Sequence, residues 1–163
     1  MSRILVGVDG SEDSKEALRW ALQEARERGL AVRALYVYGF TEEHNPFLAV
    51  YTSFGSSSAA TKSAGHAQQW QSDRDEELRR EAAEQLSSIV RSVRAETDGP
   101  KVDEVVIPSG RPARALLDQA GDCVTLAVGA RGRGGFRGLR VGSVAEKCVR
   151  HAPCSVMVAR APK

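Results

Sequence analysis

The fold is decided by the stretch Val128-Gly-Ala-Arg-Gly-Arg-Gly-Gly-Phe-Arg-Gly-Leu-Arg-Val-Gly-Ser143. It follows a short apolar run typical of a buried strand, and it ends where a helix is expected to begin. Its six glycines let the backbone approach a ligand closely. A helix N-terminus adds unsatisfied N–H donors and partial positive charge, which suit a phosphate group. The stretch therefore predicts a strand, a phosphate-binding loop and a helix in succession.

Other interpretations of this loop fit less well. No Gly-Lys-Ser or Gly-Lys-Thr closes it, which excludes a Walker A loop. A dinucleotide fingerprint is excluded because the loop follows the fourth strand and its spacing differs. A flexible linker rich in glycine and arginine remains the structural alternative, but a position between two core elements favours phosphate binding.

The rest of the chain alternates strands and helices. Strands are predicted at residues 3–8, 31–38, 102–107, 123–128 and 154–159. Helices are predicted from about Ser11 to Gly29, over 73–95, over 112–120 and over 142–151. This alternation favours an α/β fold with a parallel sheet and helices on both faces, in a single domain. Residues 40–69 show no sustained period and predict a mobile surface loop, although Phe47, Leu48, Tyr51 and Phe54 keep a lid or a partner contact possible.

Composition limits the function classes. The net charge of +2 over 163 residues is too small to indicate general nucleic-acid binding. The N-terminal apolar run is cut by Asp9 and is too short for a signal peptide, and no segment reaches membrane-spanning length. We therefore expect a cytoplasmic protein with no membrane contact. The three cysteines lack metal-type spacing and are expected to be small core residues.

The spacing Gly129, two residues, Gly132, nine residues, Gly142-Ser143 resembles the ATP-binding signature of the universal stress protein family. Four further pieces are similar to that family in the same order: Ile4-Leu-Val-Gly-Val-Asp-Gly-Ser11, Leu35-Tyr-Val37, Gly110-Arg-Pro-Ala113 and His151-Ala-Pro-Cys154. The resemblance implies a Rossmann-like, adenine nucleotide α-hydrolase-like fold. Its open five-stranded parallel sheet has the strand order 3-2-1-4-5.

The resemblance also implies a set of nucleotide-binding residues. Gly129 and Gly132 would allow close backbone approach around the ribose and phosphates, and Gly142 with Ser143 would contact the phosphate tail. Ser143 has a competing role, because Ser143-Val-Ala-Glu146 matches a helix capping box. The full set is Val8, Asp9, Val37, Val128, Gly129, Arg131, Gly132, Gly142, Ser143 and Val144.

Three of these assignments leave alternatives open. Asp9 is implied near the nucleotide and is a candidate ligand for Mg²⁺ or Mn²⁺, but an aspartate at this place is also typical of a turn or N-cap. The Val37 backbone would read the adenine edge, and core packing explains an apolar strand residue equally well. The Arg131 guanidinium suits phosphate oxygens, yet the signature leaves its position variable.

These features favour an ATP-binding stress or regulatory protein with absent or slow hydrolysis, since the sequence offers no clear catalytic base and no phosphate-binding lysine. Two other function classes stay open: an enzyme that cleaves ATP at the α-phosphate, and a partner-binding regulator that is nucleotide-free or takes a cyclic nucleotide. The resemblance further implies a homodimer formed through the last strand, residues 154–159.

Overall fold

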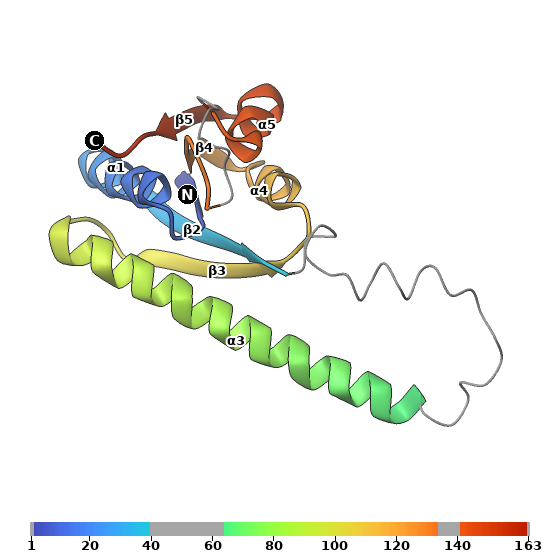
Figure 1. Cartoon of the computed structure of the whole chain (residues 1–163). Helices are drawn as coiled ribbons and strands as arrows, with labels where there is room; N and C mark the ends of the chain where they lie inside the picture. The colour runs from blue at the N-terminus through green and yellow to red at the C-terminus, as the bar shows by residue number, and fades with distance from the viewer. Residues whose placement is uncertain (1, 40–63, 134–140, 163) are drawn as a thin grey trace.

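The computed structural model describes residues 2–39, 64–133 and 141–162, with side chains in the second range from Asp73 onward. Within these described residues, five strands and four helices alternate (Figure 1). The strands are β1 (Arg3–Val8), β2 (Ala31–Tyr38), β3 (Val102–Pro108), β4 (Cys123–Gly129) and β5 (Ser155–Ala159). The helices are α1 (Glu12–Arg28), α3 (Ala64–Glu96), α4 (Pro112–Gln119) and α5 (Ser143–His151).

All neighbouring strands pair in parallel, in the order β3-β2-β1-β4-β5. This confirms the predicted fold class and strand order. The central strand β1 pairs Val8 with Tyr36 of β2 and Val6 with Ala127 of β4. Because the strands are parallel, their carboxyl ends meet at one edge of the sheet.

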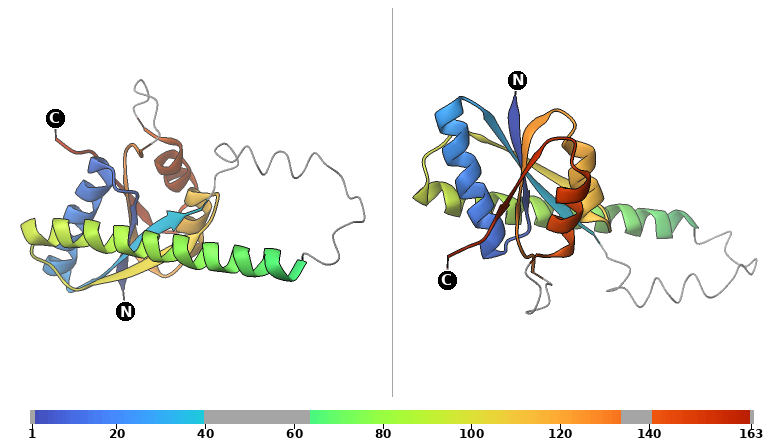
Figure 2. Two further views of the ribbon diagram at one scale, coloured as in Figure 1. Left: turned by 60° about the horizontal axis from the view of Figure 1, so that its bottom comes forward. Right: turned by 90° about the horizontal axis from the view of Figure 1, so that it is seen from above.

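The two faces of the sheet are covered by different helices. Alternate residues of β1 point to opposite faces, so Ile4 and Val6 pack with α1 and α3, whereas Leu5 packs with α4 and α5. In the right-hand view of Figure 2, α1 lies on one side of the sheet and the pair α4 and α5 on the other. The side chains of Ile4, Leu5 and Val6 are completely excluded from solvent. Burial on both faces explains why this strand is almost continuously apolar.

Helix α1 has local signals at both ends. The Ser11 side chain accepts a hydrogen bond from the Ser14 N–H at 3.2 Å and caps the first turn. At the other end Gly29 adopts a left-handed conformation with φ of 65°, and its N–H bonds to the Ala25 carbonyl. The prediction that Gly29 ends this helix is confirmed.

Helix α3 differs from its prediction. It begins at Ala64 instead of near Asp73, so the part of the expected loop between 64 and 69 is helical. Its first turns lack the apolar stripe on which the prediction relied, but extending an existing helix adds one hydrogen bond per residue fixed and needs no stripe. Figure 1 shows this end of α3 reaching beyond the sheet. The remaining loop, 40–63, with Phe47, Leu48, Tyr51 and Phe54, lies outside the described residues.

None of the described helices has both the length and the apolar character that crossing a membrane requires.

Two of the three cysteines belong to the core, as predicted. Cys148 on α5 is fully buried, and Cys123 at the start of β4 is 9% exposed. Burial raises the pKa of each of these thiols to about 11, because the thiolate loses its hydration. Cys154 is only half-buried, and burial raises the pKa of its thiol as well.

The burial of Cys148 predicts slow alkylation. The thiolate is the reactive species, so at neutral pH a thiol with a pKa of about 11 that is also inaccessible should react far more slowly with iodoacetamide than Cys154. Peptide mass spectrometry over a time course measures both sites in one sample. In denaturant the two rates should converge. Equal rates in the native protein would contradict the burial of Cys148.

Candidate functional site

A cavity of about 430 Å³ opens at the carboxyl ends of the strands, between β1 and β4. This is where ligands bind in open α/β sheets whose strand order reverses, and the volume lies in the usual range for small-molecule sites. The structure brings all ten predicted residues to its lining: Val8, Asp9, Val37, Val128, Gly129, Arg131, Gly132, Gly142, Ser143 and Val144.

The cavity has an apolar part and a polar part. Leu35, Val37, Leu116 and Val128 all belong to the cluster that packs against α4 and α5, and they give the cavity an apolar wall. Val8 is 3% exposed and belongs to the opposite cluster, against α1 and α3. The polar part is formed by the backbone that follows β4 and by the start of α5. A ligand with one flat apolar group and one anionic group matches this division.

Asp9 holds the loop that follows β4. Its Oδ2 accepts a hydrogen bond from the Arg133 N–H at 3.2 Å. Its Oδ1 accepts bonds from the Ser11 N–H at 2.9 Å and from the Ser11 hydroxyl at 2.6 Å. The interpretation of Asp9 as a turn residue is therefore correct, and the same side chain also anchors the loop of the cavity.

The described ends of the loop are bonded to each other. The Gly142 N–H donates to the Ala130 carbonyl at 2.7 Å, and the Ala130 N–H donates to the Ala159 carbonyl at the end of β5 at 2.6 Å. Residues 134–140 lie outside the described part of the chain. The two bonds hold Ala130, Gly142 and Ala159 together at one point, beside the end of β5.

Gly129 and Gly132 are required by contacts within the protein. A Cβ at Gly129 would lie 2.7 Å from the Ser14 nitrogen, and one at Gly132 would lie 2.7 Å from Asp9 Oδ2. Both distances are shorter than real Cβ contacts allow. From the sequence, these glycines are expected to make room for a ligand. The structure shows that Gly129 makes room for the first turn of α1 and Gly132 for the Asp9 side chain.

The N-terminus of α5 borders the cavity, and the amides of its first turn have no hydrogen-bond partner among the described residues. The first backbone hydrogen bond of α5 runs from the Glu146 N–H to the Gly142 carbonyl at 3.0 Å. The amides of Ser143, Val144 and Ala145 therefore have no partner within the helix. Their position and the helix dipole favour an anion at this point.

The expected capping box is wrong. Gly142, not Ser143, occupies the N-cap position, and no side-chain cap hydrogen bond forms there. A capping hydroxyl must precede the helix, whereas Ser143 already has helical geometry as its first residue. Ser143 is exposed, and helix capping does not use its hydroxyl, which supports the alternative role at the cavity.

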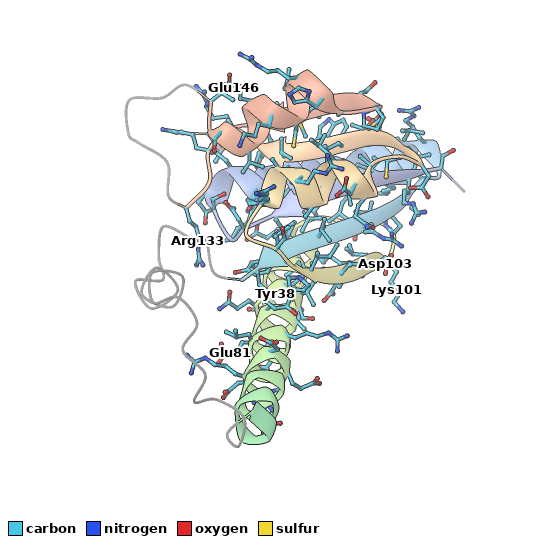
Figure 3. The ribbon with its side chains drawn as sticks, turned by 90° about the vertical axis from the view of Figure 1, so that its right-hand side faces the viewer. Tyr38, Glu81, Lys101, Asp103, Arg133 and Glu146 are labelled. Carbon is cyan, nitrogen blue, oxygen red and sulfur yellow. The ribbon has the colours of Figure 1, made fainter. Side chains whose placement is uncertain are left out.

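The two arginines of the described loop differ in their partners. Arg131 Nε lies 3.7 Å from Asp13 Oδ2, and the Arg131 side chain is 44% exposed. The Arg133 guanidinium lies over Gly10, where a Cβ would stand 3.5 Å from Arg133 Cζ. Figure 3 shows Arg133 at the carboxyl end of the sheet, at the opposite end from Lys101 and Asp103.

Sequence reasoning missed part of the lining. It omitted Gly7, Ser11, Ser14, Leu35, Pro112, Leu116, Ala130, Arg133 and Ala145 from the site. The sequence could have predicted Pro112 as a site residue, because Pro112 follows β3 and the carboxyl ends of parallel strands meet at the same edge of the sheet. The sequence could not have predicted Leu116, since an apolar residue at helical spacing indicates core packing alone.

A resident metal centre has no support in the geometry. Within the residues that the structure describes, no group of three or more His, Cys, Asp or Glu side chains could hold a metal ion. The only carboxylate among the described lining residues is that of Asp9.

Comparison with known sequences gives one consistent family. The model of the universal stress protein family matches residues 1–160. A universal stress protein of Mycobacterium tuberculosis is 31% identical over 157 residues, which are 96% of this chain and 47% of that protein. A universal stress protein of Thermus aquaticus is 30% identical, with 96% of this chain and 97% of that protein covered. The chain thus spans about half the length of the mycobacterial relative.

Solved structures show the same fold. The universal stress protein UspA from Lactobacillus plantarum is 26% identical with a TM-score of 0.62, covering 98% of this chain and 97% of that one. A universal stress protein from Archaeoglobus fulgidus in complex with dAMP has 23% identity and a TM-score of 0.57, with 98% of each chain covered. Another universal stress protein, in complex with cAMP, has 19% identity and a TM-score of 0.56, covering 99% of this chain and 98% of that one.

The close contact at Gly129 generates a stability prediction. Gly129→Ala places a Cβ against the backbone of the first turn of α1, so something must shift. We expect the free energy of unfolding to fall by about 1–3 kcal/mol, as measured by urea denaturation. Gly121→Ala is the matched control, because nothing lies within 4 Å of a Cβ there. Equal stability of the two variants would contradict the close approach.

Proposed function

The chain belongs to the universal stress protein family, and we propose that it binds ATP at the carboxyl end of its sheet and acts as a stress-response or regulatory nucleotide-binding protein. The observation that carries the proposal is the junction at Gly142. There the amides of the first turn of α5, which have no partner among the described residues, border the same cavity as the apolar wall of β2 and β4. The dAMP and cAMP complexes of proteins with this fold support an adenine nucleotide as the ligand class.

The division of the cavity orients the proposed ligand. The adenine ring lies against the apolar wall, with Val37 and Leu116 contributing to its burial. The phosphates lie at the amides of Ser143, Val144 and Ala145, where the helix dipole stabilises negative charge. The backbone N–H groups of Arg131 and Arg133 already donate hydrogen bonds to the carboxylates of Asp13 and Asp9. We therefore propose that the phosphates are bound by the amides of α5 and not by the backbone amides of Arg131 and Arg133.

Binding is better supported than turnover. A hydrolase needs a base that accepts a proton from the attacking water. Asp9 is the only carboxylate in the described lining, and both of its oxygens accept hydrogen bonds from the protein. We therefore propose that ATP hydrolysis is absent or slow.

A divalent ion would enter with the nucleotide. Mg²⁺ usually keeps several waters and takes one or two carboxylates together with the phosphates. Asp9 is the residue that fits this role, since its Oδ2 accepts a single hydrogen bond and keeps a second lone pair. The described residues offer no all-protein metal site. We propose that Mg²⁺ or Mn²⁺ contributes only when ATP is bound.

The Gly142→Val substitution tests the proposed site. Gly142 has φ of −77° and ψ of 163°, a conformation that valine adopts, and a Cβ there meets the Ala130 carbonyl at 3.4 Å. The added side chain fills the junction beside the phosphate position, so we expect ATP affinity to fall at least about tenfold in calorimetry. Gly121→Val is the matched control, outside the cavity.

The outcomes separate the function classes. Heat-released supernatant of the purified protein should contain an adenine nucleotide on chromatography, and Gly142→Val should lose it. Unchanged ATP affinity in that variant would show that the cavity is not the site. Rapid AMP release in acid-quenched incubations would establish an enzyme that cleaves the α-phosphate. Binding of cAMP in preference to ATP would correct the ligand.

We also propose a homodimer through β5. This strand pairs with β4 on one side only and stands last in the sheet, so its other edge has main-chain groups available for pairing. Val156, Met157 and Val158 are half-buried in the single chain. Two edges that pair about a two-fold axis would cover these side chains.

Light scattering tests the dimer. The chain has a mass of 17.6 kDa, and we expect a species of twice this mass in solution. Val156→Lys puts a charge into the proposed interface and should shift the species to the monomer, with the helical circular dichroism spectrum retained. A wild-type protein that is monomeric at all concentrations would refute this assembly.

A further inference from the structure

A buried carboxylate outside the cavity bonds to its loop. Asp13, in the first turn of α1, is 7% exposed. Its Oδ2 accepts a hydrogen bond from the Arg131 N–H at 3.2 Å, and its Oδ1 accepts one from the Ala161 N–H at 3.0 Å. One side chain therefore joins three segments: the start of α1, the loop after β4 and the chain that follows β5.

Helix formation does not explain this placement. An acidic residue in the first turn is stabilised by the helix dipole, but that interaction works at the surface, as the exposed neighbour Glu12 shows. Burying a carboxylate costs free energy unless hydrogen bonds and charge compensate. The amides of Arg131 and Ala161 supply the bonds, and the Arg131 guanidinium, with Nε 3.7 Å from Oδ2, supplies the charge.

A second contact joins the same segments. The Ala130 N–H bonds to the Ala159 carbonyl at 2.6 Å, two residues before Ala161. The loop at 130–131 and the chain at 159–161 thus run together, with Asp13 between their amides. Neither Asp13 nor Ala161 lines the cavity.

We infer that Asp13 is a positioning residue for the site and that it couples the chain at 160–162 to ligand binding. This inference rests on the proposed function, because it takes the adenine nucleotide as the ligand. A nucleotide that orders Arg131 and Gly132 also favours the arrangement in which Asp13 accepts from Ala161. By thermodynamic reciprocity, fixing the 160–162 segment strengthens nucleotide binding by the same factor.

Substitutions at the donor, Ala161, and at the acceptor, Asp13, test the coupling. Ala161→Pro deletes the N–H donor, and Ala161→Gly keeps it and serves as the control. Asp13→Asn keeps the side-chain shape but presents an NH₂ group to one of the two amides, so one bond is lost. We expect each of Ala161→Pro and Asp13→Asn to weaken ATP binding about three- to tenfold, with Ala161→Gly close to wild type.

The double variant shows whether the two residues act together. If they share one bond, Asp13→Asn combined with Ala161→Pro weakens ATP binding less than the product of the single effects. Multiplying effects would overturn the coupling and leave two independent perturbations. Should Asp13→Asn fail to fold, the Ala161→Pro and Ala161→Gly pair still decides the question.

Amide hydrogen exchange gives a readout that general destabilisation does not move. Saturating ATP should slow exchange of the Ala161 N–H in the wild type, and this ATP-dependent slowing should be absent in Asp13→Asn. Wild-type protein that binds ATP without any change at Ala161 would contradict the inference alone. Wild-type protein that binds no adenine nucleotide would instead contradict the proposed function.

Discussion

The site depends on the parallel pairing of β1 with β4 at the centre of the sheet. From β1 the chain moves through α1 and α3 toward β3, and from β4 it moves through α5 toward β5 in the other direction. Right-handed crossovers in opposite directions place their helices on opposite faces. The loops that follow β1 and β4 therefore separate at the carboxyl edge, and the cavity lies in the gap between them.

Hydrogen bonds join the loop that follows β4 to the turn and helix that follow β1. Asp9 and Asp13 accept the N–H groups of Arg133 and Arg131, and the absence of side chains at Gly129 and Gly132 permits this approach. The protein thereby uses two loop amides for its own structure. No side-chain cap hydrogen bond forms at the N-terminus of α5, and in the proposal its amides bind the phosphates.

Much of this arrangement follows from local signals in the sequence. Continuous apolar runs such as residues 3–8 predict buried strands, and Gly29 marks a helix end because only a left-handed residue fits there. All ten predicted site residues reach one cavity, since the carboxyl ends of β1, β2 and β4 and the start of α5 meet at one edge of the sheet.

The remaining features depend on contacts between distant segments. Asp13 accepts hydrogen bonds from the N–H groups of Arg131 and Ala161, which are 118 and 148 residues away in the sequence. The residues of the first turn of α1 give no signal that predicts these contacts. The start of α3 at Ala64 lacks an apolar pattern, so periodicity placed it too late. The capping motif at Ser143 was overridden by the geometry of the loop, which places Gly142 at the N-cap.

The most direct test of the site is a nuclear magnetic resonance titration of the ¹⁵N-labelled protein with ATP and Mg²⁺. The account predicts that the largest amide shift changes fall on Gly132, Gly142, Ser143 and Val144, with smaller changes at the amino ends of the strands. Absence of change at saturating nucleotide, or changes centred on Arg3 and Asp103 at the opposite edge of the sheet, would contradict it.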